Sequence, residues 1–293
     1  MKKNKFLYLH FIVLLWGLTP VLGKLISLQA LDLVWWRLVM SAICLLFFIF
    51  YKKITFKLNA IQLLEILAMG GIVGLHWYFF YHAIKISNVS IALAGFSTIT
   101  LFASLLQPFI LNKRFFWGDV FYGLVILIAL VIILQYETLA LYGLLFGVLS
   151  AITGAVFSIY NGKLIVKHDS SIITFVEFVG AFILISVCKL LDSSTNFLPI
   201  LTTSDFIFTL ILSVLCTTIA FTLGVQILKY ISPFTVVVTN NLEPVYGILF
   251  SVLLFGESEI MSVQFYIGAV LILLMVFSYP YFKRKLYKEN LLV

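Results

Sequence analysis

The stretch ILKYISPFTVVVTNNLEPVYGILFSVLLF, residues 227–255, shows how most of this chain is built. It is mostly apolar and longer than the roughly 20 residues that a helix needs to cross a bilayer. Its middle nevertheless holds Asn240, Asn241, Glu243 and Pro244. A carboxylate at the bilayer centre costs about 3 kcal/mol, and a proline removes one backbone hydrogen bond of the helix. These residues therefore predict a membrane helix with a kinked, polar point that faces a water-filled cavity.

The composition agrees with a chain that lies mostly in lipid. Of its 293 residues, 63% are hydrophobic and only 11% are charged, whereas a soluble domain is about half apolar and a quarter charged. The apolar stretches are continuous over about 20 residues, while the strands of a membrane barrel would be about 10 residues long and alternating. The sequence therefore predicts an all-α integral membrane protein.

Ten apolar windows of suitable length are present, separated by short loops that leave no room for a soluble domain. The expected spans are 6–27, 33–51, 60–85, 88–110, 117–135, 138–162, 170–191, 204–229, 232–255 and 259–282.

The opening stretch has a counterpart earlier in the chain, AIKISNVSIALAGFSTITLFASLLQPFIL at 83–111. The alignment matches Asn88 with Ser232, and GLVILIALVII at 123–133 likewise matches a stretch about half a chain later. Because five spans is an odd number, the second copy would start from the opposite side of the membrane. We therefore predict two inverted five-helix repeats, 1–136 and 137–293, the common plan of secondary transporters.

Charge sets the expected orientation. If the N-terminus is cytoplasmic, fifteen of the 19 Lys and Arg residues lie on the cytoplasmic side, as the positive-inside rule requires. The sequence thus predicts a multi-pass protein of the cell inner (plasma) membrane with both termini in the cytoplasm. The chain has a net charge of +7. We expect its basic residues to contact anionic lipid headgroups, and we expect no nucleic-acid partner.

Enzyme chemistry has little support in the sequence. The three cysteines lie inside expected spans at no metal-ligand spacing, the four histidines are scattered, and no glycine-rich phosphate loop is present. We therefore expect no metal, no cofactor and no catalytic residues.

Several residues resemble a known family. They are Trp16–Gly17, Lys24, Arg37 and the stretch LEPVYGILFSVLLFGE at 242–257. On these the chain resembles the EamA type of the drug/metabolite transporter superfamily over its whole length. The resemblance implies ten helices around a central cavity and export of amino acids or other metabolites. One departure is that the first half has Thr100 where the second has Pro244.

Polar residues near the middle of the spans mark the expected binding site, because transporters of this plan bind solute near the midplane. The predicted substrate-binding residues are Trp16, Tyr78, Tyr81, Ser97, Thr100, Ser150, Asn240 and Glu243. Alternatives remain for some of them. Tyr78 and Tyr81 could belong to an aromatic belt at the membrane surface. Ser97 and Ser150 could belong to helix-packing seams, and Glu243 to a structural kink.

Other charged residues in the spans are expected to stay away from this site. Arg37 lies near the start of its span and is predicted to extend outward to the interface. Glu177 is predicted to reach Lys163 or Lys167 near the cytoplasmic face. Glu243 would then be the only ionisable residue close to the midplane.

The prediction for function is a secondary transporter that exports amino acids or related small metabolites by alternating access. An importer or facilitator of another solute is the alternative, and an intramembrane enzyme or receptor is the alternative from another class. The expected partners are a small-molecule solute and the lipid bilayer, with proton coupling left open, and the protein would be a monomer or a homodimer.

Overall fold

The computed structural model describes residues 2–112, 141–192, 198–256 and 260–289, and single positions between 121 and 132. Within this part every regular element is a helix, and eight helical segments are long and apolar enough to cross a membrane. The predicted all-α membrane fold is confirmed. Some of the predictions fall wholly or mostly outside the described residues, namely the span 117–135, the repeated stretch 123–133 and Glu257. The count of ten spans therefore stays a prediction.

The helices differ from the expected spans mainly in being interrupted. In chain order they are α1 Lys2–Gly17, α2 Thr19–Leu25, α3 Ala30–Tyr51, α4 Ala60–Ile86, α5 Val89–Phe96, α6 Ile99–Ile110, α8 Leu141–Leu164, α9 Ser170–Leu191, α10 Thr203–Ile211, the π-helix η2 Leu212–Ile219, α11 Ala220–Ile227, α12 Pro233–Asn240, α13 Leu242–Phe255 and α14 Val263–Glu289.

Polar side chains at the ends of the apolar runs fix where several helices begin. Asn59 and Gln62 form a reciprocal capping box at the start of α4, with hydrogen bonds of 2.9 and 3.0 Å. Asp169 caps α9 and the Thr202 hydroxyl caps α10. Such caps satisfy backbone N–H groups that have no partner within the helix.

The two stretches that the sequence aligns have the same local structure. Asn88 caps α5 and Ser232 caps α12. Each helix is eight residues long and stops before a break, at Ser97 in one half and at Asn241 in the other. The Asn241 amide nitrogen donates a hydrogen bond to the Thr100 hydroxyl, so the two broken spans lie against each other at their breaks.

Another interruption is the π-helix between α10 and α11. The hydroxyls of Thr217 and Thr218 donate to the carbonyls of Leu212 and Ser213, five residues back, at 2.7 and 2.9 Å. π-Helical turns are rare and often occur at functional sites.

Small residues allow the central helices to pack closely. α4 packs against both α8 and α9. A Cβ atom on Gly70 of α4 would lie 2.2 Å from the carbonyl oxygen of Glu177 on α9, and one on Gly95 would lie 2.6 Å from a carbonyl oxygen of α8. Close backbone approach at glycine is a usual way for helices to associate in lipid.

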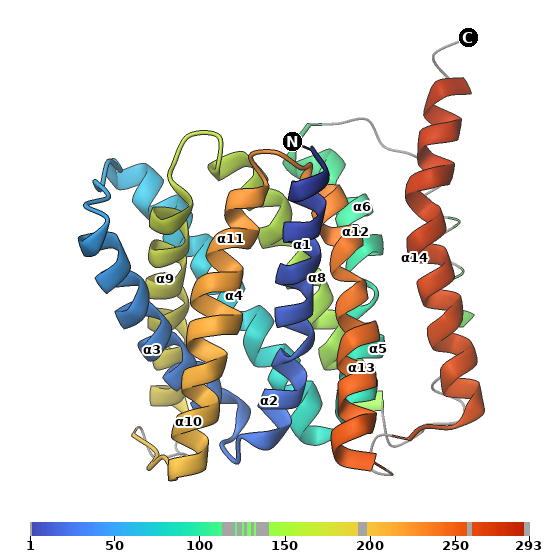
Figure 1. Ribbon diagram of the computed structural model, residues 1–293, viewed down its shortest axis with the longest axis horizontal. Helices are drawn as coiled ribbons and strands as arrows, with labels where there is room; N and C mark the ends of the chain where they lie inside the picture. Colours follow the sequence, from blue (N-terminus) through green and yellow to red (C-terminus); the bar gives the residue numbers. More distant parts are fainter. Residues whose placement is uncertain are drawn as a thin grey trace.

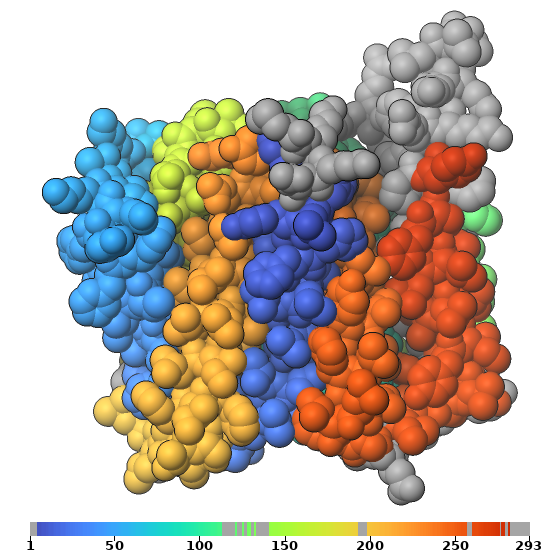
Figure 2. Space-filling view, viewed as in Figure 1, coloured from blue at the N-terminus to red at the C-terminus, as the bar shows by residue number. Residues whose placement is uncertain are grey.

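The bundle has two distinct ends (Figure 1). We call the end where α1 begins and α14 ends the N-terminal end, and the end where α3 begins and α9 ends the distal end. Between them α1 lies beside α11 and α12–α13 (Figures 1 and 2). The outward side chains of Leu7, Phe47 and Leu253 are 73%, 71% and 72% exposed, as expected for a surface that faces lipid.

Candidate functional site

A cavity of about 70 Å³ lies inside the bundle, and both halves of the chain line it. Its lining residues are Trp16, Thr19, Arg37, His76, Trp77, Phe80, Phe96 and Ile99 from the first half, and Phe157, Ser158, Asn161, Phe221, Gly224, Val225, Leu228, Val236, Asn240 and Glu243 from the second. Asn161, Leu228 and Val236 lie within about one turn of the helix ends at the N-terminal end, so the cavity extends from mid-span toward that end.

Arg37 is part of this cavity, and the prediction that it extends outward is wrong. Its side chain is 3% exposed. Nε donates to the Thr217 hydroxyl at 2.6 Å and Nη1 to the Tyr81 hydroxyl at 2.8 Å, while the guanidinium lies 3.9 Å from the Trp77 ring centroid. Hydrogen-bond acceptors and an aromatic face inside the bundle thus hold the cation there, which outweighs the attraction of the interface.

Glu243 also faces the cavity, as its position at the helix break predicts. It is the second residue of α13, two positions after the Asn241 break, and is 7% exposed. Among the described residues no side chain or backbone group hydrogen-bonds its carboxyl group, but it interacts electrostatically with Arg37. The cavity therefore contains a fixed cation from the first half and an acid from the second, so Glu243 is not the only ionisable group at this depth.

Aromatic rings form much of the remaining wall. The Trp16 ring lies over Gly224, where an added Cβ would come within 2.7 Å of it. Phe157 and Phe221 pack at a centroid distance of 5.7 Å, and Trp77 packs on Phe221 at 5.8 Å. These rings give the site an apolar body around two charged points, the usual character of small-molecule sites.

Of the eight predicted site residues, Trp16, Asn240 and Glu243 line the cavity. The other five are absent from its lining and make other contacts: Tyr81 accepts from Arg37, Tyr78 stacks on His82, the Ser97 hydroxyl donates to the Leu93 carbonyl, Thr100 accepts from Asn241, and Ser150 contacts the His76 ring nitrogen. Tyr81 and Ser150 therefore support Arg37 and His76, which do line the cavity.

Sequence reasoning missed Arg37, His76 and Asn161 as lining residues. A signal existed for Arg37, because a cation inside an apolar span points to the protein interior by default. His76 carried the same signal, because it is an ionisable residue near the middle of an apolar span. Asn161 carried a weaker one, since it is uncharged and lies near the end of its span.

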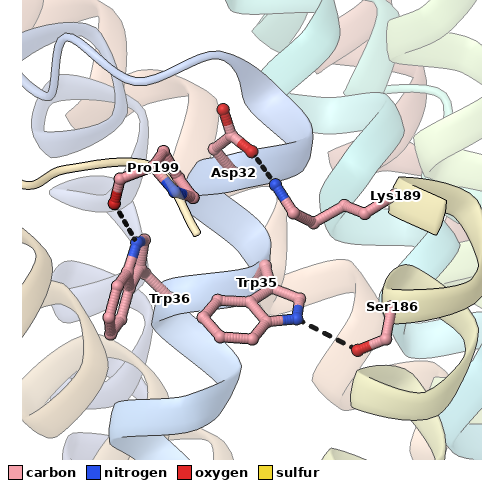
Figure 3. Close-up of polar contacts among 6 residues, drawn as sticks. All are labelled: Asp32, Trp35, Trp36, Ser186, Lys189 and Pro199. Atoms are coloured by element: carbon pink, nitrogen blue, oxygen red, sulfur yellow. Dashed lines mark hydrogen bonds and ion pairs between the residues drawn. The ribbon is translucent and has the colours of Figure 1, made fainter. Parts of the chain in front are cut away.

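Polar contacts close the distal end of the bundle (Figure 3). Lys189 of α9 forms an ion pair with Asp32 of α3, and the Trp35 indole nitrogen donates to the Ser186 hydroxyl at 3.0 Å. The Trp36 indole nitrogen donates to the Pro199 carbonyl at 3.3 Å. All of these contacts join the first half of the chain to the second.

A second set of contacts lies beside them. Asp205, at the start of α10, accepts hydrogen bonds from the backbone and hydroxyl of Ser27 at 2.6 and 2.7 Å. The Lys85 ammonium donates to the Ile26 carbonyl. Closer to the cavity, the Tyr81 ring packs so tightly on Gly23 that a Cβ there would lie 2.4 Å from it. We call these two sets together the distal contacts.

Comparison with known proteins agrees with this architecture. The model of the EamA-like transporter family matches residues 5–135 and, a second time, residues 141–279. A solved structure described as "Crystal structure of protein" is similar with a TM-score of 0.69 at 15% identity, over 94% of this chain and 96% of that one, which supports the fold alone. No curated protein matches the chain in sequence. Since the family model covers both halves, the chain belongs to the EamA-like transporter family and is a membrane transporter.

Proposed function

We propose that the protein is a secondary transporter that exports an amino acid or a related small metabolite across the inner membrane by alternating access. The observation that carries this proposal is that a guanidinium group, Arg37, and a carboxyl group, Glu243, face one cavity from the two halves. A zwitterionic solute presents a carboxylate and an ammonium group that match this pair.

Both charged groups retain capacity to bind a solute. Two of the Arg37 nitrogens are used by Thr217 and Tyr81, while Nη2 makes no hydrogen bond to the described residues. The Glu243 carboxyl group accepts none from the same part of the chain. A hydrogen bond to a charged group contributes about 1.5–3 kcal/mol, so two such contacts would dominate the binding of a small solute.

The size of the cavity favours a small solute. One water molecule needs about 10–15 Å³ of such space, so a cavity of about 70 Å³ holds roughly five waters or a solute of a few heavy atoms. The aromatic rings of Trp16, Phe157 and Phe221 would surround the solute's apolar part. A larger side chain would require these rings to move apart.

The two ends of the bundle support alternating access. The cavity reaches toward the N-terminal end, and the distal contacts close the other end. With the N-terminal end in the cytoplasm, this conformation would receive solute from inside the cell. Rocking of two inverted five-helix halves, 1–136 and 137–293, would break those distal contacts that join the halves, such as Asp32–Lys189 and Ser27–Asp205, and open the other side.

The first prediction is transport by the purified protein. Vesicles loaded with one unlabelled amino acid should take up its labelled form by exchange, in a panel of neutral, cationic and anionic amino acids. We expect exchange of at least one small zwitterion well above protein-free vesicles. Net movement with and without an imposed gradient distinguishes an exporter or importer from a facilitator. Absence of exchange for every zwitterion, with exchange of a singly charged solute, would contradict the proposed charge pair.

The second prediction concerns orientation. The test uses a chain whose natural cysteines are replaced by alanine and which carries a single new cysteine. One variant has it at Ile200, 92% exposed near the distal end, and another has it at Lys285 near the other end. Each cysteine shows on which side of the membrane its end lies. In intact cells an impermeant maleimide should label position 200, and position 285 only after permeabilisation. Labelling of position 285 in intact cells would reverse the proposed topology.

A further inference from the structure

A second buried carboxyl group lies behind the wall of the cavity. Glu177 is in the first half of α9, within an apolar membrane span, and its side chain is 0% exposed. The prediction that it reaches Lys163 or Lys167 is wrong: in the described part of the chain its carboxyl group contacts Asn161, and Lys163 Nζ lies 3.8 Å from Glu65 Oε1. The backbone at Glu177 packs directly on Gly70 of α4, so this part of the helix interface is closely packed.

The hydrogen bonds around Glu177 are incomplete in one specific way. The Asn161 amide nitrogen donates to Oε2 of Glu177 at 3.3 Å. The other carboxyl oxygen, Oε1, and the amide oxygen of Asn161 are both buried and have no partner in the described part of the chain. Thr174, one turn earlier on α9, has a third such oxygen. Two facing side chains thus each leave an acceptor without a donor, an arrangement that is costly in a protein interior.

Among the described residues no charged side chain interacts with the Glu177 carboxyl group, whose polar partner is Asn161. Helix α11 carries no ionisable residue. The neighbouring helices α3, α4 and α8 carry ionisable side chains, but these side chains contact residues other than Glu177. These contacts are Glu65 with Lys163 and Tyr160, His76 with Ser150, Tyr78 with His82, Lys85 with Ile26, Asp32 with Lys189, and Arg37 with Tyr81 and Thr217.

We propose that Glu177 and Asn161 form a proton-binding site. A proton bound to one carboxyl oxygen makes an O–H group that donates to the Asn161 amide oxygen, while the Asn161 amide nitrogen continues to donate to the other carboxyl oxygen. One O–H bond forms when the proton arrives from water and breaks when the proton returns to water. A single proton therefore supplies the donor that both orphan acceptors lack.

Asn161 connects this site to the cavity, which it also lines. With the proton bound, both ends of its amide are held by Glu177. Without the proton, the amide oxygen is released and an unpaired carboxylate remains in the apolar interior, which is unfavourable until water reaches it. Proton release is thus tied to a conformation in which the contact between α8 and α9 opens. This coupling to solute movement rests on the proposed transport function, whereas the proton site itself does not.

Infrared difference spectroscopy of the purified protein across a pH series tests the site directly, with the proton as the only ligand. We expect the carbonyl stretch of a protonated carboxylic acid to decrease as pH rises, to shift in D₂O, and to be lost in Glu177→Gln. Glu65→Gln is the matched control, since it makes the same change at a partly exposed carboxylate. A wild-type titrating band that persists at full amplitude in Glu177→Gln, or no such band in the wild type, would overturn the proposal.

A second variant separates proton binding from a structural role. In Asn161→Ala the titrating band should remain but move to higher frequency, because the carbonyl loses the amide donor. An unchanged band position would refute the pairing with Asn161, and this result does not depend on whether Glu177→Gln folds.

A transport experiment distinguishes the proton site from the proposed transport function. Uptake of a labelled small zwitterion that the wild type exchanges should respond to an imposed pH gradient in the wild type and in Glu65→Gln, and should no longer respond in Glu177→Gln. If the wild type exchanges no zwitterion, the proposed function is contradicted. The infrared result would still show whether Glu177 binds a proton. A response that persists in Glu177→Gln would overturn the coupling.

Discussion

Glu243→Gln is expected to lower the rate of solute exchange at least about 10-fold while the protein remains folded. The substitution keeps the shape of the side chain and removes only its charge, so the break between α12 and α13 should be retained. The loss corresponds to one charge-assisted contact with the solute, worth about 1.5–3 kcal/mol. Exchange in vesicles and thermal unfolding in detergent measure the two effects separately.

Glu65→Gln serves as the control for this variant. Glu65 is a carboxylate on α4 with a side chain 32% exposed, and it contacts Lys163 and Tyr160 outside the cavity lining. Its substitution should leave the exchange rate close to that of the wild type. Equal rates in Glu243→Gln and the wild type would mean that Glu243 only shapes the helix break.

Reversal of one charge in the distal ion pair is expected to have the second large effect. Asp32 and Lys189 are nearly inaccessible, with side chains 10% and 0% exposed. Asp32→Lys would place two ammonium groups together, and loss of one partner of a buried pair costs about 3–5 kcal/mol. Because the pair joins the two halves, much of this penalty should fall on the conformation in which the distal end is closed.

The exchanged pair Asp32→Lys with Lys189→Asp is the matched rescue, since it restores opposite charges at the same positions. Cys216 lies beside Thr217 and is 1% exposed, so its reaction with a maleimide measures how often the distal end opens. With Cys44 and Cys188 replaced, an impermeant maleimide added from the distal side should label Cys216 faster in Asp32→Lys than in the wild type, and slowly again in the exchanged pair. Equal labelling in all three would show that the ion pair does not hold this end closed.

The helical membrane fold could be predicted from the sequence because lipid permits few alternatives. Continuous apolar runs of about 20 residues satisfy their backbone groups only as helices. The alignment of Asn88 with Ser232 also predicted a shared local structure, and both residues cap an eight-residue helix. Residue type and position along the chain sufficed here, since capping is a local interaction.

The cavity lining was predicted less well, because depth in the membrane does not determine which way a side chain points. Ser97 and Thr100 lie at the expected depth, yet their hydroxyls are used in contacts with neighbouring backbone or Asn241. Arg37 was placed at the interface because its partners, Tyr81 and Thr217, are far away in sequence. Such partners become visible only when the helices are packed together.

The π-helix at Leu212–Ile219 affects how this chain is compared with others. A π-helical turn closes its hydrogen bonds over five residues instead of four, so it holds about one residue more than an α-helical turn. A relative with an uninterrupted α-helix here would need one residue fewer between Asp205 and Gly224. An alignment without that gap would shift every later residue of the span by one, which is about 100° around the helix. It would therefore pair Gly224, which lies under the Trp16 ring, with a residue on a different face.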